Sequence, residues 1–249
     1  MNDTERLAEL ISQGGVVFFG GAGVSTESGI PDFRSEAGLY AAESVYGHSP
    51  EKLLSHTFFI REPETFFRYY KENLISLEAL PNAAHLALAE LERRGLVTAV
   101  ITQNIDGLHS AAGSAKVLEL HGSNLRQYCM KCGAKYSLDY VMDSADIVPK
   151  CEKCDGTVRP DVVLYEESLD DDVMREAVRC VENADTLIVG GTSLAVHPAA
   201  GLLRYYDGRS LVLINKSETT YDVAASIIIR RPIGEVFAEV MQNPAIRAH

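Results

Sequence analysis

The sequence of 249 residues has no long apolar run, and none of its stretches approaches the ~20 apolar residues that span a bilayer. Residues 1–10 mix acidic and apolar side chains and do not have the pattern of a signal peptide. Internal repeats and low-complexity segments are also missing. We therefore expect a cytoplasmic, globular protein that does not bind membranes.

Basic residues are scarce relative to acidic ones: 23 Lys and Arg stand against 35 Asp and Glu, for a net charge of −12. This charge repels nucleic acid and anionic membrane surfaces, so neither is an expected partner. It would attract a basic ligand such as a lysine-bearing peptide, although an acidic surface also serves solubility alone.

Cysteines number only five, and four of them form two CxxC pairs, Cys129/Cys132 and Cys151/Cys154, with 18 residues between the pairs. Thiolates at this spacing are typical of a tetrahedral zinc site. In a reducing compartment such pairs favour metal over disulfides. Four sulfurs leave no position open for water, so we predict one structural zinc per chain. A zinc ribbon that binds nucleic acid is the alternative, which the acidic charge disfavours.

Helical and strand patterns alternate along most of the chain, which predicts an α/β fold with a parallel sheet covered by helices on both faces. Two segments interrupt the alternation: residues 34–80 are rich in aromatic side chains and suit short helices, and residues 124–160 surround the cysteines. Strand character resumes at 161–165. The predicted strands are 16–19, 97–102, 117–120, 186–190 and 211–215, and the predicted helices are 3–12, 82–94, 170–183, 198–206 and 234–241.

Small and polar residues follow four of the predicted strands, in the segments 20–25, 102–109, 190–193 and 215–217. The carboxyl ends of parallel strands share one edge, so these segments outline a crevice that suits a dinucleotide. Backbone N–H groups of a glycine-rich turn can bind its diphosphate. Taken singly, each segment is also an ordinary turn. A hydride-transferring dehydrogenase is disfavoured, because Thr26 stands at the third glycine position of the GxGxxG sequence that is typical of such enzymes.

A histidine, His121, stands at the end of the strand 117–120 and precedes a glycine. Such a side chain can titrate near neutral pH and act as a general base in a cleft. A lone histidine is more often structural, and five others compete on composition alone: His48, His56, His85, His109 and His197.

Taken together, these strings resemble the sirtuin family, in its order and spacing and over nearly the whole chain. The absence of long terminal extensions is similar to the short bacterial members. The matching strings are GAGVSTESGIPDFR (21–34), TQNIDGLH (102–109), HG (121–122), the paired CxxC module, GTSL (191–194) and IN (214–215).

The resemblance implies an NAD-dependent protein-lysine deacetylase. It implies a Rossmann-like NAD-binding domain of residues 1–33, 82–123 and 161–249. A small domain would consist of a helical insert, 34–81, and a zinc-ribbon insert, 124–160. NAD and an acyl-lysine protein or peptide would meet between the domains. Nicotinamide would leave, and His121 would act as base toward O-acetyl-ADP-ribose and free lysine.

The resemblance also assigns site residues. Catalysis falls to His121 and Asn104, and the substrate peptide to Val163, Leu164, Tyr165 and Glu166. Phe33 would cover the nicotinamide and Arg34 would stabilise the cofactor loop. The NAD-binding residues are Ala22, Gly23, Ser25, Thr26, Phe33, Arg34, Gln103, Asn104, Ile105, Asp106, His121, Gly191, Thr192, Ser193, Asn215, Lys216 and Ile233.

Departures from the family pattern occur at Gly20, where Thr is usual, and at Tyr165 and Glu166, where the family has Phe and Gly. The charge of Glu166 predicts a preference for peptides with basic flanks, unless the side chain simply faces solvent. After the PDFR string, Tyr40 has no Arg beside it to bind an acidic acyl group, so acetyl or another uncharged acyl group is expected. Mono-ADP-ribosyl transfer and a non-catalytic zinc- and NAD-binding module are alternatives. We expect a monomer.

Overall fold

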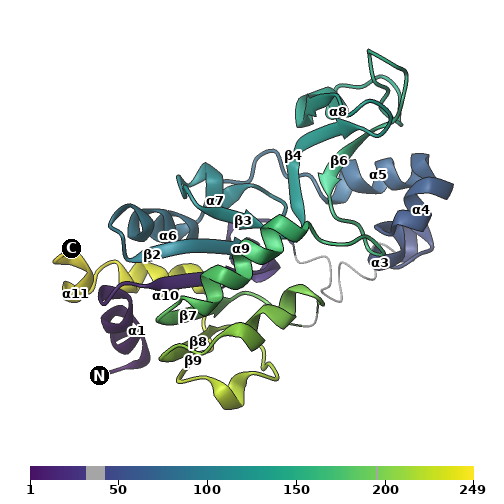
Figure 1. The fold of residues 1–249 in the computed structure, drawn as a ribbon. Helices are drawn as coiled ribbons and strands as arrows, with labels where there is room; N and C mark the ends of the chain where they lie inside the picture. Colours follow the sequence, from purple (N-terminus) through teal and green to yellow (C-terminus); the bar gives the residue numbers. More distant parts are fainter. Residues whose placement is uncertain (32–42, 195) are drawn as a thin grey trace.

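The computed structural model describes residues 1–31, 43–194 and 196–249, so Phe33, Arg34 and Tyr40 lie outside the described residues. Its main feature is a six-stranded sheet in the order β3-β2-β1-β7-β8-β9, in which every neighbouring pair is parallel (Figure 1). The strands are β1 (Val16–Gly20), β2 (Val97–Thr102), β3 (Val117–Glu119), β7 (Thr186–Gly190), β8 (Ser210–Ile214) and β9 (Ile227–Ile229).

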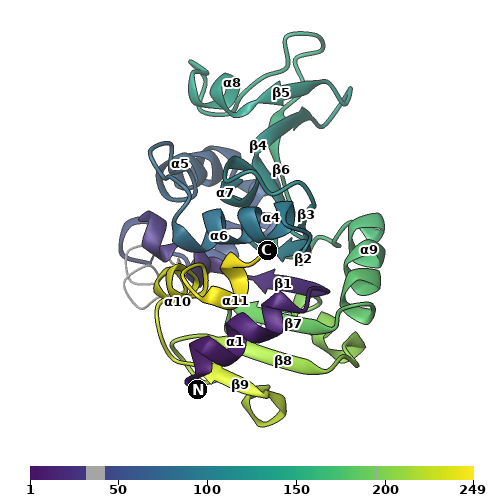
Figure 2. The same ribbon diagram turned by 90° about the vertical axis from the view of Figure 1, so that its left-hand side faces the viewer.

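Both faces of this sheet are buried, because successive side chains of a strand point to opposite sides. Val16 and Phe18 belong to one apolar core, and Val17 and Phe19 belong to the other. This explains why the strands read as continuous apolar runs. The helices α1 (Asp3–Ser12), α6 (Ala83–Arg93), α10 (Ile233–Val240) and α11 (Pro244–Arg247) cover the first face; α9 (Asp171–Glu182) and the 3-10 helix η3 (Ala199–Tyr205) cover the second (Figure 2).

A smaller module stands beside the sheet, at the upper right and right of Figure 1. It holds a three-stranded antiparallel sheet in the order β5-β4-β6. A third core joins the aromatic side chains of residues 53–70 to Cys129, Cys151 and Val158, so the two inserted segments pack together. The module's elements are α3 (Pro50–Leu53), α4 (His56–Arg61), α5 (Pro63–Asn73), β4 (Gly122–Cys129), β5 (Lys135–Ser137), α8 (Leu138–Met142) and β6 (Val158–Val162).

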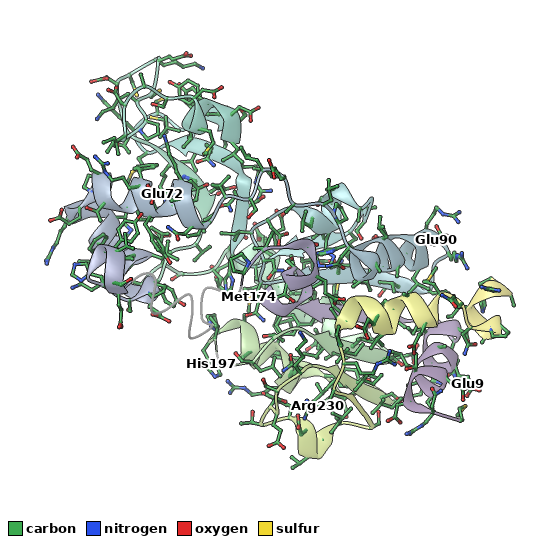
Figure 3. The ribbon with its side chains drawn as sticks, turned by 180° about the vertical axis from the view of Figure 1, so that it is seen from behind. Glu9, Glu72, Glu90, Met174, His197 and Arg230 are labelled. Carbon is green, nitrogen blue, oxygen red and sulfur yellow. The ribbon has the colours of Figure 1, made fainter. Side chains whose placement is uncertain are left out.

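The remaining elements are short connections: η1 (Ala22–Val24) and η2 (Thr26–Ser28) after β1, α7 (Leu108–Ala111) after β2, and η4 (Asp222–Ala224) before β9. Figure 3 shows the molecule from behind, with Glu72 of α5 on the small module and Glu9, Glu90 and Arg230 on the sheet module. No helix in the described part of the chain is long and apolar enough to cross a membrane.

The predicted α/β class with a parallel sheet is confirmed, and helix α6 begins, as expected, with Asn82 as its cap. The strand expected at 161–165 is wrong in extent and place, because β6 covers 158–162 and pairs with β4 of the small sheet. The predicted boundary between 160 and 161 therefore falls inside a strand. The helix expected at 198–206 is a 3-10 helix, and β9 and α11 were not predicted.

Two buried histidines lie together beneath the sheet edge. The ring centroids of His85, on α6, and His109, on α7, are 4.6 Å apart, and His109 also contacts Phe18. Within the described residues, Nε2 of His85 and both ring nitrogens of His109 have no hydrogen-bond partner. Burial lowers the pKa of His85 to about 4, against the opposing effect of Asp106, and burial lowers the pKa of His109 to about 3.

This pair should make stability fall in mild acid. Both folded pKa values lie below the ordinary value of 6.5, so the unfolded chain takes up protons first as the pH falls. The stabilisation is complete above about pH 6.5 and is lost toward pH 4, at about 1.4 kcal/mol per pKa unit. Urea unfolding between pH 7.5 and 5 measures it. His85→Gln should decline less steeply than the parent, whereas the exposed control His249→Gln should match it; equal slopes for all three would contradict the assignment.

Candidate functional site

The carboxyl ends of the three central strands lie level at one edge of the sheet. Gly20 of β1 is in register with Thr102 of β2 on one side and Gly190 of β7 on the other. From β1 the next strands along the chain, β2 and β3, are added on one side of β1. The later strands β7, β8 and β9 are added on its other side, so the strand order reverses at β1. In open α/β sheets, ligands bind at such a reversal point.

The glycine-rich loop after β1 packs directly on the loop after β7. The N–H of Gly23 donates to the carbonyl oxygen of Gly191 at 2.8 Å. A Cβ at Gly23 would lie 2.8 Å from the Gly191 Cα, and a Cβ at Gly21 would lie 2.8 Å from the Thr192 Cβ. Gly191 also has a φ of +61°. The glycines are therefore needed for this backbone contact, because a β-carbon at these positions would overlap the facing loop.

Two further contacts anchor this loop. The side-chain amide of Asn82 donates to the carbonyl oxygen of Val24 at 2.7 Å and to the Ser28 Oγ at 3.0 Å. Glu27 accepts a hydrogen bond from the N–H of Gly234, in the first turn of α10, at 2.7 Å. Asn82 was predicted only as a helix cap and Glu27 was not singled out, because nothing in the sequence pattern links either to a partner so far along the chain.

The residues after β2 reach into the same loop. The hydroxyl of the buried Ser25 donates to Asp106 Oδ2 at 2.6 Å and accepts from Asn104 Nδ2 at 3.0 Å. Asp106 Oδ1 accepts from the N–H of Leu108 at 2.9 Å, so both carboxylate oxygens are bonded. Ile105 is half-buried between Asn104 and Asp106. The structure thus brings these predicted residues together into one polar network.

On the other side, Gln103 Nε2 donates to the buried Thr192 Oγ1 at 3.1 Å, joining the loops after β2 and β7. Ser193 and Lys216 are exposed beyond their strands, and Asn215 is half-buried. Ala22 and Gly23 are half-buried in the first loop, and Thr26 is exposed. The Ile233 side chain is instead buried in the first core, where it covers Gly190.

His121 lies where β3 gives way to β4 and is half-buried. Its Nδ1 is 2.9 Å from the carbonyl oxygen of Gln103. A carbonyl only accepts, so Nδ1 carries the proton and Nε2 is the basic nitrogen. The next residue, Gly122, has a φ of +76°, and a Cβ there would lie 2.0 Å from the Asp161 carbonyl oxygen. Glycine thus permits the close turn that presents His121.

The segment predicted to bind peptide leaves β6 beside this histidine. The N–H of Val163 donates to the carbonyl oxygen of His121 at 2.9 Å. Tyr165 pairs with Ser55 in an isolated parallel bridge. Leu164 is buried, Val163 and Tyr165 are half-buried, and Glu166 is exposed. The segment therefore connects the histidine to the start of α4.

The four paired cysteines converge at the far end of the small module. Their sulfurs all lie within 4.8 Å of one another, with Cys129 and Cys154 Sγ 3.5 Å apart and Cys132 and Cys151 Sγ 3.6 Å apart. A zinc tetrahedron with bonds of about 2.3 Å separates its sulfurs by about 3.8 Å, so the donors fit zinc. Cys129 lies at the opposite end of β4 from Gly122, roughly 20 Å along an extended strand. A metal there cannot touch a reaction at His121.

The fold and the site define an α/β protein of the dinucleotide-binding type, with a histidine at the sheet edge and a four-cysteine cluster that fits zinc. The Sir2 family model matches residues 21–198, and the chain belongs to the Sir2 family. An NAD-dependent protein deacetylase of Clostridium acetobutylicum is 57% identical over 226 residues, which cover 91% of this chain and 92% of that protein.

Solved structures of Sir2 proteins are also similar to this chain. A Sir2 chain with a p53 peptide and NAD+ has a TM-score of 0.86 and 39% identity, covering 97% of this chain and 98% of that chain. A Sir2 variant with deacetylated p53 peptide and 3'-O-acetyl-ADP-ribose has a TM-score of 0.88 at 39% identity, with the same coverage.

The zinc site predicts one zinc per chain in freshly purified, reduced protein, measured by metal analysis. Cys129→Ala should lose most of the zinc and unfold at lower temperature, because the binding free energy of a structural zinc is folding free energy. Cys180, a buried cysteine of α9 outside the cluster, is the matched control, and Cys180→Ala should keep its zinc. Protein without zinc, or a Cys129→Ala variant of unchanged stability, would refute the site.

Proposed function

We propose that this protein is an NAD-dependent protein-lysine deacetylase. In that reaction an acetyl-lysine, NAD+ and water give lysine, nicotinamide and O-acetyl-ADP-ribose. The observation that carries the proposal is the place of His121, between loops suited to a dinucleotide and a segment suited to a peptide, with its basic nitrogen defined by the bond to Gln103. The named relative and the two solved Sir2 complexes support the same activity.

NAD supplies the ribose that accepts the acetyl group and the nicotinamide that leaves. The loop after β1 would hold the diphosphate through Ala22, Gly23, Ser25 and Thr26, whose small side chains leave room for it at the sheet edge. Gln103 and Asn104 would hold ribose hydroxyls, and Ile105 and Asp106 the carboxamide. The adenosine half would meet Gly191, Thr192, Ser193, Asn215 and Lys216 after β7 and β8.

His121 would take the proton of a ribose hydroxyl at Nε2 when that hydroxyl attacks the carbon derived from the acetyl group. The bond from Nδ1–H to the Gln103 carbonyl orients the ring and stabilises the charged imidazolium that results. Gln103 thus contributes its backbone to the base and its side chain to the loop after β7. Asn104, held by Ser25, would orient the ribose for this step.

The acyl-lysine peptide would add as a strand beside residues 163–165. The N–H of Val163 and both backbone groups of Leu164 already bond within the chain, so the carbonyl of Val163 is the group through which a peptide strand would pair there. Tyr165 would add a hydroxyl to the acyl pocket. We also propose that the chain divides into an NAD-binding domain and a small zinc domain, and that it acts as a monomer. Every residue that we assign to the site belongs to one chain, which supports the monomer.

Nicotinamide release, followed with and without an acetylated peptide, tests the proposal. Peptide-dependent release with a matching amount of O-acetyl-ADP-ribose is expected. Release without peptide, accompanied by ADP-ribose bound to protein in the mass spectrum, would indicate mono-ADP-ribosyl transfer instead. No release under either condition would indicate a binding module.

Substitution of the base should slow the reaction without unfolding the protein. We expect His121→Ala to lower turnover about 10²–10⁴-fold at saturating NAD and peptide, which is the usual effect of losing a general base. The thermal midpoint should change little. His249→Ala, at the exposed C-terminus, is the control. Near-normal turnover of His121→Ala would assign the base to another residue.

A further inference from the structure

Glu166 has an unusual backbone conformation for a residue with a side chain. Its φ is +75°, in the left-handed region, where a β-carbon crowds the backbone and glycine is favoured. Such a conformation persists only where surrounding contacts hold it. The residue directly follows the segment 163–165, where we propose that the peptide binds. Its backbone conformation therefore determines the direction in which the chain leaves that segment.

The carboxylate of Glu166 is bonded to the first turn of α4. Its Oε2 accepts from the N–H of Thr57 at 2.9 Å and from the Thr57 hydroxyl at 2.6 Å. These bonds, the hydroxyl first, lower the pKa of Glu166, with smaller effects from His56 and Arg61. The side chain is exposed but already has a partner in its own chain.

The neighbouring residues are tied to the same place. Tyr165 accepts a backbone bond from the N–H of His56 at 2.9 Å and donates one to Leu54 at 3.0 Å. Glu167 binds the guanidinium of Arg159 at 2.6 and 3.0 Å, and it accepts from the N–H of Leu164 at 2.8 Å. Arg159 is only 4% exposed, so this ion pair is fixed in the small module.

We propose that Glu166 is a positioning residue: by binding Thr57 it fixes segment 163–166 to α4 and holds the edge on which the peptide pairs. The inference rests on the proposed deacetylase function. It is an alternative to the expectation that Glu166 selects basic peptides, because Oε2 already accepts two bonds from Thr57. The left-handed backbone and the Thr57 bonds act together, since the bonds hold the strained conformation.

Three substitutions separate strain from tethering. Glu166→Ala keeps the β-carbon in the left-handed region and removes the tether. Glu166→Gly removes both the β-carbon and the bonds to Thr57. Thr57→Val removes only the hydroxyl bond and keeps the side-chain shape. We expect Glu166→Ala to raise the peptide KM about two- to tenfold, the range for one or two partly exposed hydrogen bonds. The NAD KM should stay unchanged, and Thr57→Val should have a smaller effect of the same kind.

The cycle is completed by the double variant and two controls. Adding Thr57→Val to Glu166→Ala should raise the peptide KM no further, because the bond is already lost. Thr57→Ser should behave as the parent, since its hydroxyl can still donate. Glu64→Ala removes an exposed glutamate of α5 in the same module and should leave both KM values unchanged.

A readout independent of activity distinguishes failure of this inference from failure of the proposed function. Hydrogen exchange of the protein alone should be faster in Glu166→Ala than in the parent for the amides of His56, Thr57 and Tyr165. Unchanged exchange and unchanged peptide KM would overturn the inference. A changed ratio of KM values for basic-flanked and acidic-flanked peptides, shrinking with salt, would overturn it in favour of charge recognition. If the parent protein has no deacetylase activity but Glu166→Ala still exchanges faster than the parent, only the deacetylase proposal is contradicted.

Discussion

The backbone contact between Gly23 and Gly191 is the constraint on which the rest of the site depends. It joins two loops that leave adjacent parallel strands at one sheet edge, and a β-carbon at either glycine would push them apart. With the loops in contact, Ser25 reaches the residues after β2 and Thr192 reaches Gln103. Three distant stretches of sequence thereby form one polar surface suited to a dinucleotide.

The small module depends on a second close approach, between Gly122 and the carbonyl of Asp161. The chain leaves the large sheet just after His121 and returns beside it through Val163, so the proposed base and the proposed peptide-binding segment lie side by side. The cysteines lie at the other end of β4 and stabilise the module from there. A zinc bound there would be separated from the histidine that we propose as the base.

Much of the fold could be predicted because the strands β1, β2 and β7 are buried on both faces along most of their length and are therefore mostly apolar. The segment 161–165 was misplaced because its apolar residues suit either sheet, and pairing with β4 is a contact distant in sequence. β9 was missed because three isoleucines are too short a run to separate from a loop. The Ile233 side chain packs in the first core, and its place at the cofactor stays a prediction.

The sequence by itself determined the family, the four thiolate ligands and the polar residues at the strand ends, because these depend on residue type and spacing along the chain. Only the tertiary structure decided which of them meet. Asn82 anchors the cofactor loop, and Glu166 turns to Thr57 of α4. Such contacts have no sequence signature, since they are set by how separate elements pack and by a left-handed backbone conformation that packing must hold.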